Sequence, residues 1–244
     1  MKAKIKILIG IALLLSASGA AVLSSCQNSE NPMILSFIAD LKAQDLQFYW
    51  KGDKGEKLKS IQNLKSYVEG KRSRLVFAMN GGMFDKECSP KGLFIQNKKM
   101  LVPLDTASGR GNFYLKPNGV FYVTAGNIPF VCKTDDFLWS KSIKNATQSG
   151  PMLVVDGKIH PDFRQGSKNL NIRNGVGILP DNKVVFAMSK NEINFYDFAR
   201  YFQDLGCRNA LYLDGFVSRT YLPEKEWIQT DGNFGVMIGV IRKK

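Results

Sequence analysis

Four segments of this sequence share one pattern, in which an apolar run typical of a buried strand meets a turn containing glycine and polar side chains. The pattern constrains the fold, because glycine lets a strand turn sharply and lets a ligand or another backbone come close. The N–H groups of such turns can also bind anions. The segments are residues 80–85, 148–152, 173–177 and 214–218. If the four turns converge, they form a pocket with one acid, one guanidinium and many neutral hydrogen-bond donors.

The last of these segments is the strongest candidate for chemistry. The uncharged run 210–213 predicts a buried strand, and Asp214 and Gly215 follow it directly. A carboxylate at the end of a buried strand loses hydration, which costs free energy unless donors or a ligand compensate. Asp214 is therefore our first candidate for a reactive group. The alternative is that it only caps a turn.

Three segments are candidates for helices. Apolar residues recur at helical spacing over 58–69, and Gly70 stands at the C-cap position. Residues 134–141 are a second candidate, with Thr134 as the N-cap and two acids in the first turn. Asn194 caps the third, whose aromatic stripe is typical of a core-facing helix and stops at Gly206.

The rest of the chain predicts short strands joined by local hairpins, of which Asp156-Gly157 is the clearest signal. Strict alternation of strands and helices is absent, which argues against a doubly wound fold. We therefore predict an α+β fold: a mixed, largely antiparallel β-sheet core with two or three helices packed on it.

The N-terminus predicts export. Three lysines precede an apolar run over residues 7–23, and the ending Leu23-Ser-Ser-Cys26 resembles the lipobox of bacterial lipoproteins. We expect a lipoprotein signal peptide over 1–25, lipidation of Cys26, a polar tether over 26–33 and a single domain over 34–244. This predicts a lipid-anchored protein of the cell envelope, facing the periplasm or the cell surface. The alternative is a plain signal peptide with a chance cysteine.

The charge balance favours anionic partners. Cleavage of the signal removes three lysines and no acid, so the net charge falls from +13 to +10. Such a charge attracts phosphorylated glycans, anionic envelope polymers or lipid headgroups. No nucleic-acid motif accompanies it, so we expect no nucleic-acid partner, and contact with the membrane through the lipid only.

Cysteine and histidine usage predicts neither a metal site nor a cofactor. Cys88, Cys132 and Cys207 remain in the mature chain, and none has metal-ligand spacing with His160, the only histidine. One disulfide is possible in an exported protein, but the sequence does not choose the pair, and buried thiols are favoured. A lone histidine is more often a hydrogen-bonded structural residue than a reactive one.

The four segments, in this order and together with Asn209-Ala-Leu-Tyr-Leu-Asp-Gly215, resemble the phosphodiester glycosidase family, which includes the lysosomal "uncovering enzyme". The resemblance runs from about Leu75 to Ile241. One departure is Phe216, where better-known members have a second glycine; it would narrow the pocket or offer a sugar a stacking surface. Three further stretches are similar to a bacterial branch of the family: Ser89-Pro-Lys-Gly-Leu, Gly111-Asn-Phe-Tyr-Leu-Lys-Pro-Asn-Gly-Val-Phe and Ala146-Thr-Gln-Ser-Gly-Pro-Met-Leu-Val.

The resemblance implies hydrolysis of the C–O bond between a sugar's anomeric carbon and a phosphodiester oxygen, in envelope, dietary or host glycoconjugates. On residue chemistry, Asp214 would act at the anomeric carbon as nucleophile or as base for water. His160, or water, would assist proton transfer, and Arg173 would hold the phosphate. The expected substrate-binding residues are Asn80, Gly81, Gly82, Phe84, Ser149, Gly150, Arg173, Asn174, Gly215 and Ser218.

Two other classes of function remain open at this stage. A non-catalytic envelope lipoprotein could bind phosphorylated glycans with the same pocket, although a pure anion binder gains nothing from a buried acid. A phosphodiesterase that cleaves the P–O bond would normally show a metal cluster of His and Asp, for which one histidine is too few.

Overall fold

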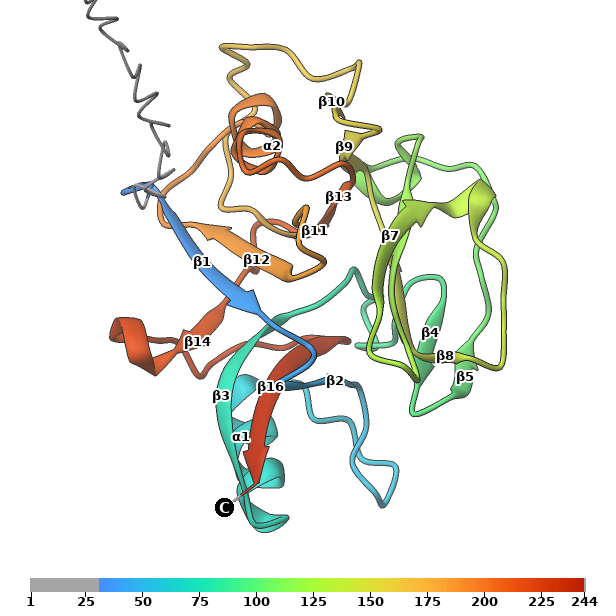
Figure 1. Ribbon diagram of the computed structural model, residues 1–244, viewed down its shortest axis with the longest axis vertical. Coiled ribbons are helices and arrows are strands. Elements are labelled where there is room, and N and C mark those ends of the chain that lie inside the picture. The colour runs from blue at the N-terminus through green and yellow to red at the C-terminus, as the bar shows by residue number, and fades with distance from the viewer. Residues whose placement is uncertain (1–30, 244) are drawn as a thin grey trace, which may run out of the picture. The chain divides into compact units, whose positions relative to one another are not determined.

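The structure is a computed structural model that describes residues 31–243 (Figure 1). The predicted signal peptide, the lipidation site Cys26 and the first part of the tether lie outside the described residues. From Asn31 onward the chain forms one compact unit. Within the described part, no helix is long and apolar enough to cross a bilayer.

Sixteen strands in residues 31–243 form three sheets, and every strand pairing within them is antiparallel. The six-stranded sheet contains, in spatial order, β1 (Ile34–Ala39), β12 (Val184–Ser189), β11 (Asn174–Ile178), β13 (Ala210–Asp214), β9 (Met152–Val155) and β10 (Lys158–Ile159). One five-stranded sheet contains β15 (Trp227–Ile228), β14 (Thr220–Leu222), β3 (Ser73–Asn80), β16 (Met237–Lys243) and β2 (Asp45–Tyr49). The other contains β5 (Lys99–Val102), β4 (Phe94–Gln96), β8 (Ile143–Ser149), β6 (Gly119–Thr124) and β7 (Pro129–Lys133).

The main core lies where the three sheets meet, and buried aromatic rings join them. Phe77 of β3 stacks on Phe37 of β1, with ring centroids 4.5 Å apart. Phe186 of β12 contacts Phe77 at 5.2 Å and Phe121 of β6 at 5.8 Å. Each ring comes from an inward-facing position of its strand, as the period-2 alternation of strands requires. The core therefore fixes the three sheets relative to one another, and with them the strand ends that carry the candidate site.

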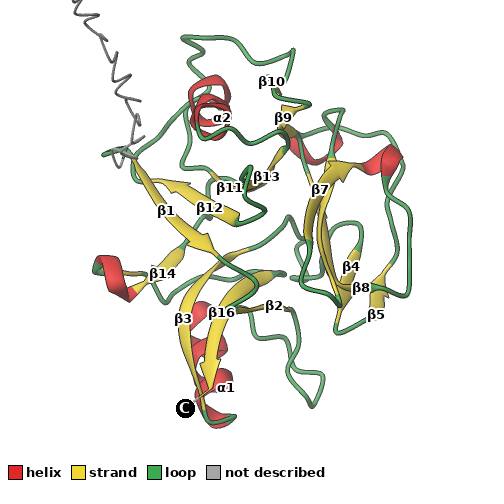
Figure 2. Cartoon of the chain, viewed as in Figure 1, coloured by secondary structure: helices red, strands yellow, loops and turns green. Residues whose placement is uncertain are grey.

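Two α-helices in the described residues cover separate sheets. Helix α1 (Ile61–Gly70) is capped by Ser60 and contacts β3, whereas α2 (Phe195–Asp204) packs on the six-stranded sheet. Asn194 accepts a hydrogen bond from the Asp197 N–H, which confirms the predicted N-cap of α2. The predicted α+β class is confirmed. Figure 2 shows strands joined by long loops, including the one that connects β10 to β11.

The helix predicted over residues 134–141 is wrong. Only Thr134–Asp136 form a single 3-10 turn, and the chain then becomes extended at Phe137. Thr134 does not act as a cap, because its side chain is buried and its hydroxyl accepts a bond from Gln148 Nε2. Phe137 packs on Tyr122 of the neighbouring sheet. Tertiary packing therefore overrides the local helix signal.

The three cysteines in the described residues are free thiols. Burial raises the pKa of Cys207 to about 12, and burial, with a smaller contribution from Asp136, raises that of Cys132 to about 11. A thiol with a raised pKa is a poor nucleophile at neutral pH. The expected buried free thiols are confirmed for Cys88 and Cys207, whereas Cys132 is a free thiol that is only half-buried.

Candidate active site

Three strand ends meet at the candidate site: the C-terminal ends of β3 and β13 and the N-terminal end of β11. They carry Asn80, Asp214 and Asn174 respectively. Asn174 Nδ2 donates to both the carbonyl oxygen and Oδ1 of Asn80, at 2.9 and 3.0 Å. Its Oδ1 accepts from the backbone N–H of Asp214 at 2.8 Å. Asn174 therefore joins two sheets and places the predicted acid beside Asn80.

A β-bulge sets the position of Asp214. Gly175 lies opposite Tyr212, but Asn174 lies opposite Asp214, so Leu213 is an extra residue on β13. A bulge bends its strand and redirects the following side chain, and bulges are frequent next to active sites. Leu213 has no paired residue on β11, and its carbonyl instead accepts a hydrogen bond from Ser149 Oγ at 2.8 Å. The predicted site residue Ser149, at the end of β8, thus supports the bulge from the third sheet.

The orientation of the Asn80 amide follows from its partners. Its Oδ1 accepts from Asn174 Nδ2 and from the backbone N–H of Arg219, so its Nδ2 must face the other way. That nitrogen lies 3.4 Å from Asp214 Oδ2. The other carboxylate oxygen accepts from the Gly215 N–H at 2.8 Å. Both oxygens of Asp214 therefore have a donor, and the carboxylate is held in one orientation.

The Asp214 carboxyl group is half-buried, and its pKa is higher than that of an ordinary aspartate. Burial raises its pKa to about 6, while the hydrogen bonds from Gly215 and Asn80 act in the opposite direction. A raised carboxyl pKa in a hydrogen-bonded strand end is typical of functional sites. A turn-capping Asp at the protein surface would instead have an ordinary or lowered pKa.

The other glycine turns lie close to this network, with little space for side chains. Gly82, two residues after Asn80, packs on β8, because a Cβ there would lie 2.6 Å from Thr147 Oγ1. Gly81 follows Asn80 and packs on Ile238 of β16. Gly150 follows Ser149 and packs on Asn118. Ser218 closes the turn after Asp214, since its hydroxyl and N–H both donate to the Gly215 carbonyl at 2.5 and 2.7 Å.

Gly215 is packed tightly against the hydroxyl group of Tyr212. A Cβ at this position would lie 2.1 Å from the hydroxyl oxygen of Tyr212, whose ring is buried. We expect Gly215→Ala to destabilise the protein by about 1–3 kcal/mol, because overpacking forces buried groups to move. Thermal unfolding measures this. Gly126→Ala is the matched control, because its nearest neighbour would be 3.8 Å away. Equal melting temperatures for both variants would contradict the tight packing of Gly215.

Arg173, predicted to bind phosphate, lies behind the network rather than in it. Its side chain is 1% exposed. Nε donates to the Ile193 carbonyl at 2.8 Å, and Nη2 donates to the carbonyl and Oδ1 of Asn169 at 2.9 and 3.0 Å. The guanidinium stacks on Phe195 at 3.6 Å, and burial lowers its pKa. Most of its hydrogen-bonding capacity is thus occupied by protein groups.

His160, the predicted proton-transfer group, is placed in a different environment from Asp214. Its ring is buried and stacks on Phe163 at 4.7 Å. Nδ1 accepts from the Asp162 N–H at 3.2 Å, and Nε2 is 3.0 Å from the Lys116 carbonyl. This pair of partners places the proton on Nε2. Burial lowers the pKa of the ring, which favours a neutral structural histidine.

The structure adds two residues, Arg219 and Tyr212, to the predicted set. Arg219 contributes its backbone N–H to Asn80, and its Nε contacts both carboxylate oxygens of Asp231 at 2.9 Å. Tyr212 lies under Gly215, a contact that no local pattern could reveal. Phe84, predicted to bind substrate, packs edge-to-face on Phe234, with centroids 6.5 Å apart. In the sequence, the only local sign of the contact between Arg219 and Asn80 is that Arg219 directly follows Ser218 of the fourth glycine turn.

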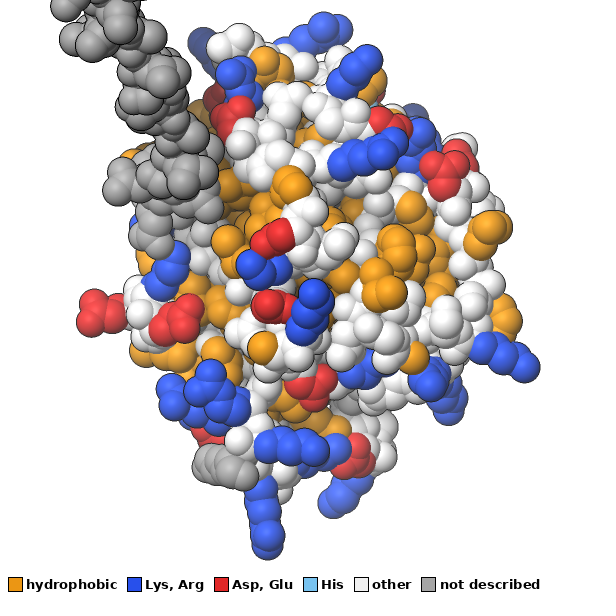
Figure 3. Space-filling model, viewed as in Figure 1, with side chains coloured by type: hydrophobic (Ala, Val, Ile, Leu, Met, Phe, Trp, Pro, Cys, Tyr) orange, Lys and Arg blue, Asp and Glu red, His pale blue; other side chains and the backbone are white. Residues whose placement is uncertain are grey.

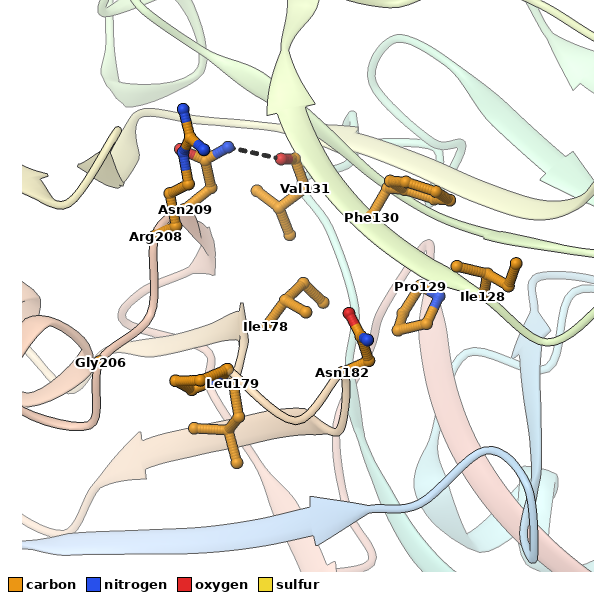
Figure 4. Close-up of a pocket in the computed structure, with 11 residues that line it drawn as sticks. Ile128, Pro129, Phe130, Val131, Ile178, Leu179, Asn182, Gly206, Arg208 and Asn209 are labelled. Carbon is orange, nitrogen blue, oxygen red and sulfur yellow. Dashed lines mark hydrogen bonds between the residues drawn. The ribbon is translucent and has the colours of Figure 1, made fainter.

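A pocket of about 380 Å³ lies at the other end of β13 (Figure 4). It is bordered by β7, the β11–β12 turn and the residues that precede β13. Asn209 at its edge donates to the Val131 carbonyl at 2.9 Å and accepts from the Asp156 N–H. The five residues of β13 separate this pocket from Asp214 by roughly 15 Å. Asn209 of the Asn-Ala-Leu-Tyr-Leu-Asp-Gly motif is therefore structural.

Between residues 31 and 243, no group of three or more His, Cys, Asp or Glu side chains is arranged so that it could hold a metal ion.

The positive surface charge is spread out. In Figure 3 the Lys and Arg side chains are dispersed over the visible face rather than gathered in one stripe. On this face the positive charge therefore acts as a general field that attracts anions.

The chain is similar to several known proteins. The uncharacterized protein YigE of Escherichia coli (strain K12) is 36% identical over 235 residues, which cover 96% of this chain and 92% of YigE. The catalytic domain of zebrafish N-acetylglucosamine-1-phosphodiester alpha-N-acetylglucosaminidase, auto-inhibited by its pro-peptide, has a similar fold: the TM-score is 0.58 at 16% identity, covering 87% of this chain and 84% of that one. A putative exported protein from Burkholderia pseudomallei K96243 has a TM-score of 0.52 at 10% identity, covering 85% and 73%.

The two solved structures support the fold alone, because their sequence identities are low. The family assignment comes from the sequence. The phosphodiester glycosidase model matches residues 73–239, a range that includes Asn80, Ser149, Asn174, Asp214 and Ser218. With this match, the chain belongs to the phosphodiester glycosidase family.

Proposed function

We propose that this protein hydrolyses the glycosidic C–O bond of a sugar-1-phosphodiester, and that Asp214 acts at the anomeric carbon. The observation that carries the proposal is the state of Asp214. Its carboxylate is half-buried, fixed by Asn80 and Gly215, and has a pKa raised to about 6. In a family of phosphodiester glycosidases, a carboxylate in this condition fits the oxocarbenium-like transition state.

The chemistry requires one carboxylate rather than two. The bond between the anomeric carbon and the phosphodiester oxygen breaks, and its electron pair leaves with the phosphate monoester. Such a leaving group is stable without protonation, so a separate general acid contributes less than in an ordinary glycoside. Asp214 then either forms a glycosyl ester that water hydrolyses, or removes a proton from the attacking water. The network around it contains this single carboxyl group, which is consistent with either route.

Arg219 is better placed than Arg173 to face the phosphate. Its side chain is half-buried, whereas Arg173 is closed off by Phe195 and backbone carbonyls. The N–H of Arg219 is bonded to Asn80, so its position is tied to the Asp214 network. Asp231 holds the Nε side of the guanidinium, and Nη1 donates to the Ser218 carbonyl at 3.0 Å. A positioned guanidinium stabilises charge that develops on a leaving phosphate.

The bond that is cleaved can be tested directly. A sugar-1-phosphodiester whose phosphate carries a methyl group is hydrolysed in water enriched in oxygen-18, and both products are analysed by mass spectrometry. Label in the sugar is expected, because water attacks the anomeric carbon. Label in the phosphate would mean P–O cleavage and would refute the glycosidase mechanism. Tight binding without hydrolysis would instead support a non-catalytic glycan-binding lipoprotein.

The pH dependence of kcat/KM is a second expected result. Asp214 must be ionised to support positive charge, and its pKa is about 6. Activity should therefore be constant above about pH 7 and fall roughly tenfold per pH unit below 6, as the carboxylate takes up a proton. An initial-rate profile from pH 4 to 8, with pre-incubation controls for stability, measures this. A profile that stays flat down to pH 4.5 would show that the essential acid has an ordinary pKa.

The predicted lipid anchor completes the proposal. Cys26 lies outside the described residues, and the proposal rests on the Leu23-Ser-Ser-Cys26 sequence after the apolar run. A lipid on Cys26 would hold the domain at the membrane of the cell envelope, close to glycoconjugate substrates. Cys26→Ser should move the protein from the membrane fraction to the soluble fraction. If the variant stays in the detergent phase of a partition experiment, the anchor lies elsewhere.

A further inference from the structure

Phe216 is the feature of the site region that the mechanism does not use. Its side chain is 84% exposed, although it lies only two residues after Asp214. Full exposure of a phenylalanine forgoes about 2 kcal/mol of burial free energy. Single exposed apolar residues are common on protein surfaces, so exposure alone carries no function. Phe216, however, lies in the turn between Asp214 and Ser218, where an exposed ring could contact a bound substrate.

The turn that carries Phe216 is anchored at both ends. Gly215 donates to Asp214, Ser218 donates twice to the Gly215 carbonyl, and the next N–H donates to Asn80. Gly215 is further confined by the Tyr212 hydroxyl beneath it. The backbone of Phe216 is therefore fixed relative to the reacting carboxylate. An aromatic surface held in this way binds a ring at low entropic cost.

Chain geometry limits how far Phe216 can lie from the reaction. Two residues of extended chain span at most about 7 Å between their Cα atoms, and the ring adds roughly 5 Å of reach. The sugar must enter the half-buried part of the site to bring its anomeric carbon to Asp214. The exposed ring of Phe216 is then left for the outer part of the substrate, which lies beyond the phosphate.

We infer that Phe216 forms an aromatic subsite for the leaving group, and that the preferred substrates are sugar-1-phosphodiesters whose leaving group carries a ring with a flat apolar face. The inference rests on the proposed glycosidase function. Val217, next to Phe216 and 36% exposed, extends the same apolar surface. Stacking between two rings increases affinity by about three- to tenfold. Phe216 thus acts on specificity, whereas Asp214 acts on the bond that breaks.

The test compares two substrates with the same sugar, in which the phosphate carries either a methyl or a 2-phenylethyl group. Both leave as alkyl phosphates of similar acidity, so chemistry at the anomeric carbon is matched. The wild-type kcat/KM should favour the 2-phenylethyl substrate by about three- to tenfold. Phe216→Ala should bring the ratio of the two kcat/KM values close to one, mainly by lowering the value for the 2-phenylethyl substrate. Phe216→Trp should keep the preference. Phe130→Ala is the control, since Phe130 is another exposed aromatic, on β7.

A binding measurement separates this inference from the proposed function. Calorimetry with 2-phenylethyl phosphate and methyl phosphate needs no turnover. Tighter binding of the 2-phenylethyl compound to wild type, lost in Phe216→Ala, supports the subsite even if no phosphodiester is cleaved. Equal binding of the two compounds to wild type, or an unchanged preference in Phe216→Ala, overturns it. Failure of the glycosidase function alone appears as a missing turnover with the binding difference intact.

Discussion

Asp214→Asn is expected to lower kcat by about a thousandfold while changing KM little. The substitution keeps the size of the side chain and an acceptor for the Gly215 N–H, but it removes the charge that would support an oxocarbenium-like transition state. A loss confined to kcat is the signature of an interaction made in the transition state. Steady-state kinetics on a sugar-1-phosphodiester, together with circular dichroism of the same preparation, measures it.

The stability of the same variant distinguishes a reactive acid from a structural one. The folded pKa of Asp214 is raised from 3.8 to about 6, so between these pH values the folded state binds more protons than the unfolded state. Stability therefore falls as pH rises from about 4 to 6, and the ionised carboxylate costs up to about 3 kcal/mol at pH 8. Because Asp214→Asn removes this charge, its melting temperature at pH 8 should equal or exceed that of wild type.

Asp85 supplies the matched control for Asp214→Asn. It follows another glycine turn of the same pattern, and its Oδ1 accepts from the N–H groups of Glu87 and Ser89 at 2.8 and 2.9 Å. This is a turn-capping role, so Asp85→Asn should cost at most about 1 kcal/mol and keep nearly full turnover. If the Asp214 variant behaved like the Asp85 variant, Asp214 would be a capping residue and the chemistry would lie elsewhere.

The residues at strand ends could be predicted because their signals are local. An apolar run that borders Asp-Gly or Asn-Gly marks a strand end and a turn without reference to the rest of the chain. This local signal identifies Asn80 and Asp214, which follow their runs, and Asn174, which precedes its run. Their convergence could only be a hypothesis. Asn80 and Asp214 are 134 residues apart, and the bulge at Leu213 that aligns them is a property of strand pairing.

The environments of Arg173 and His160 could not be read from the sequence. Phe195 of α2 stacks on the Arg173 guanidinium and on Phe163, which in turn stacks on His160. The same aromatic stripe that predicts a core-facing helix thus buries both polar residues. The sequence pattern of glycine turns next to Arg173 is the same whether the guanidinium faces solvent or is buried. The packing of α2 buries it, and the local sequence does not reveal that packing.

Arg173→Ala is expected to lower the free energy of unfolding by about 3–5 kcal/mol. It leaves a cavity beside Phe195 and removes the charged hydrogen bonds that the guanidinium donates to the carbonyls of Ile193 and Asn169. Denaturant unfolding at pH 7 measures the loss. The control is Arg208→Ala, because the Arg208 side chain is largely exposed and its contacts with Asp156 are long, at 3.4 Å. This control should change stability by less than about 0.5 kcal/mol.

Arg173→Lys then separates a structural role from the phosphate-binding role that the sequence predicts. A lysine keeps the charge but cannot reproduce the fork that reaches Ile193 and Asn169, nor the planar stack on Phe195. For a structural arginine, the melting temperature falls while KM for a phosphodiester stays close to that of wild type. For a phosphate ligand, KM rises several-fold and the melting temperature changes little. The burial of the guanidinium favours the first result. The second would mean that the loop carrying Asn169 moves aside when substrate binds, and that Arg173 then joins Arg219 at the phosphate.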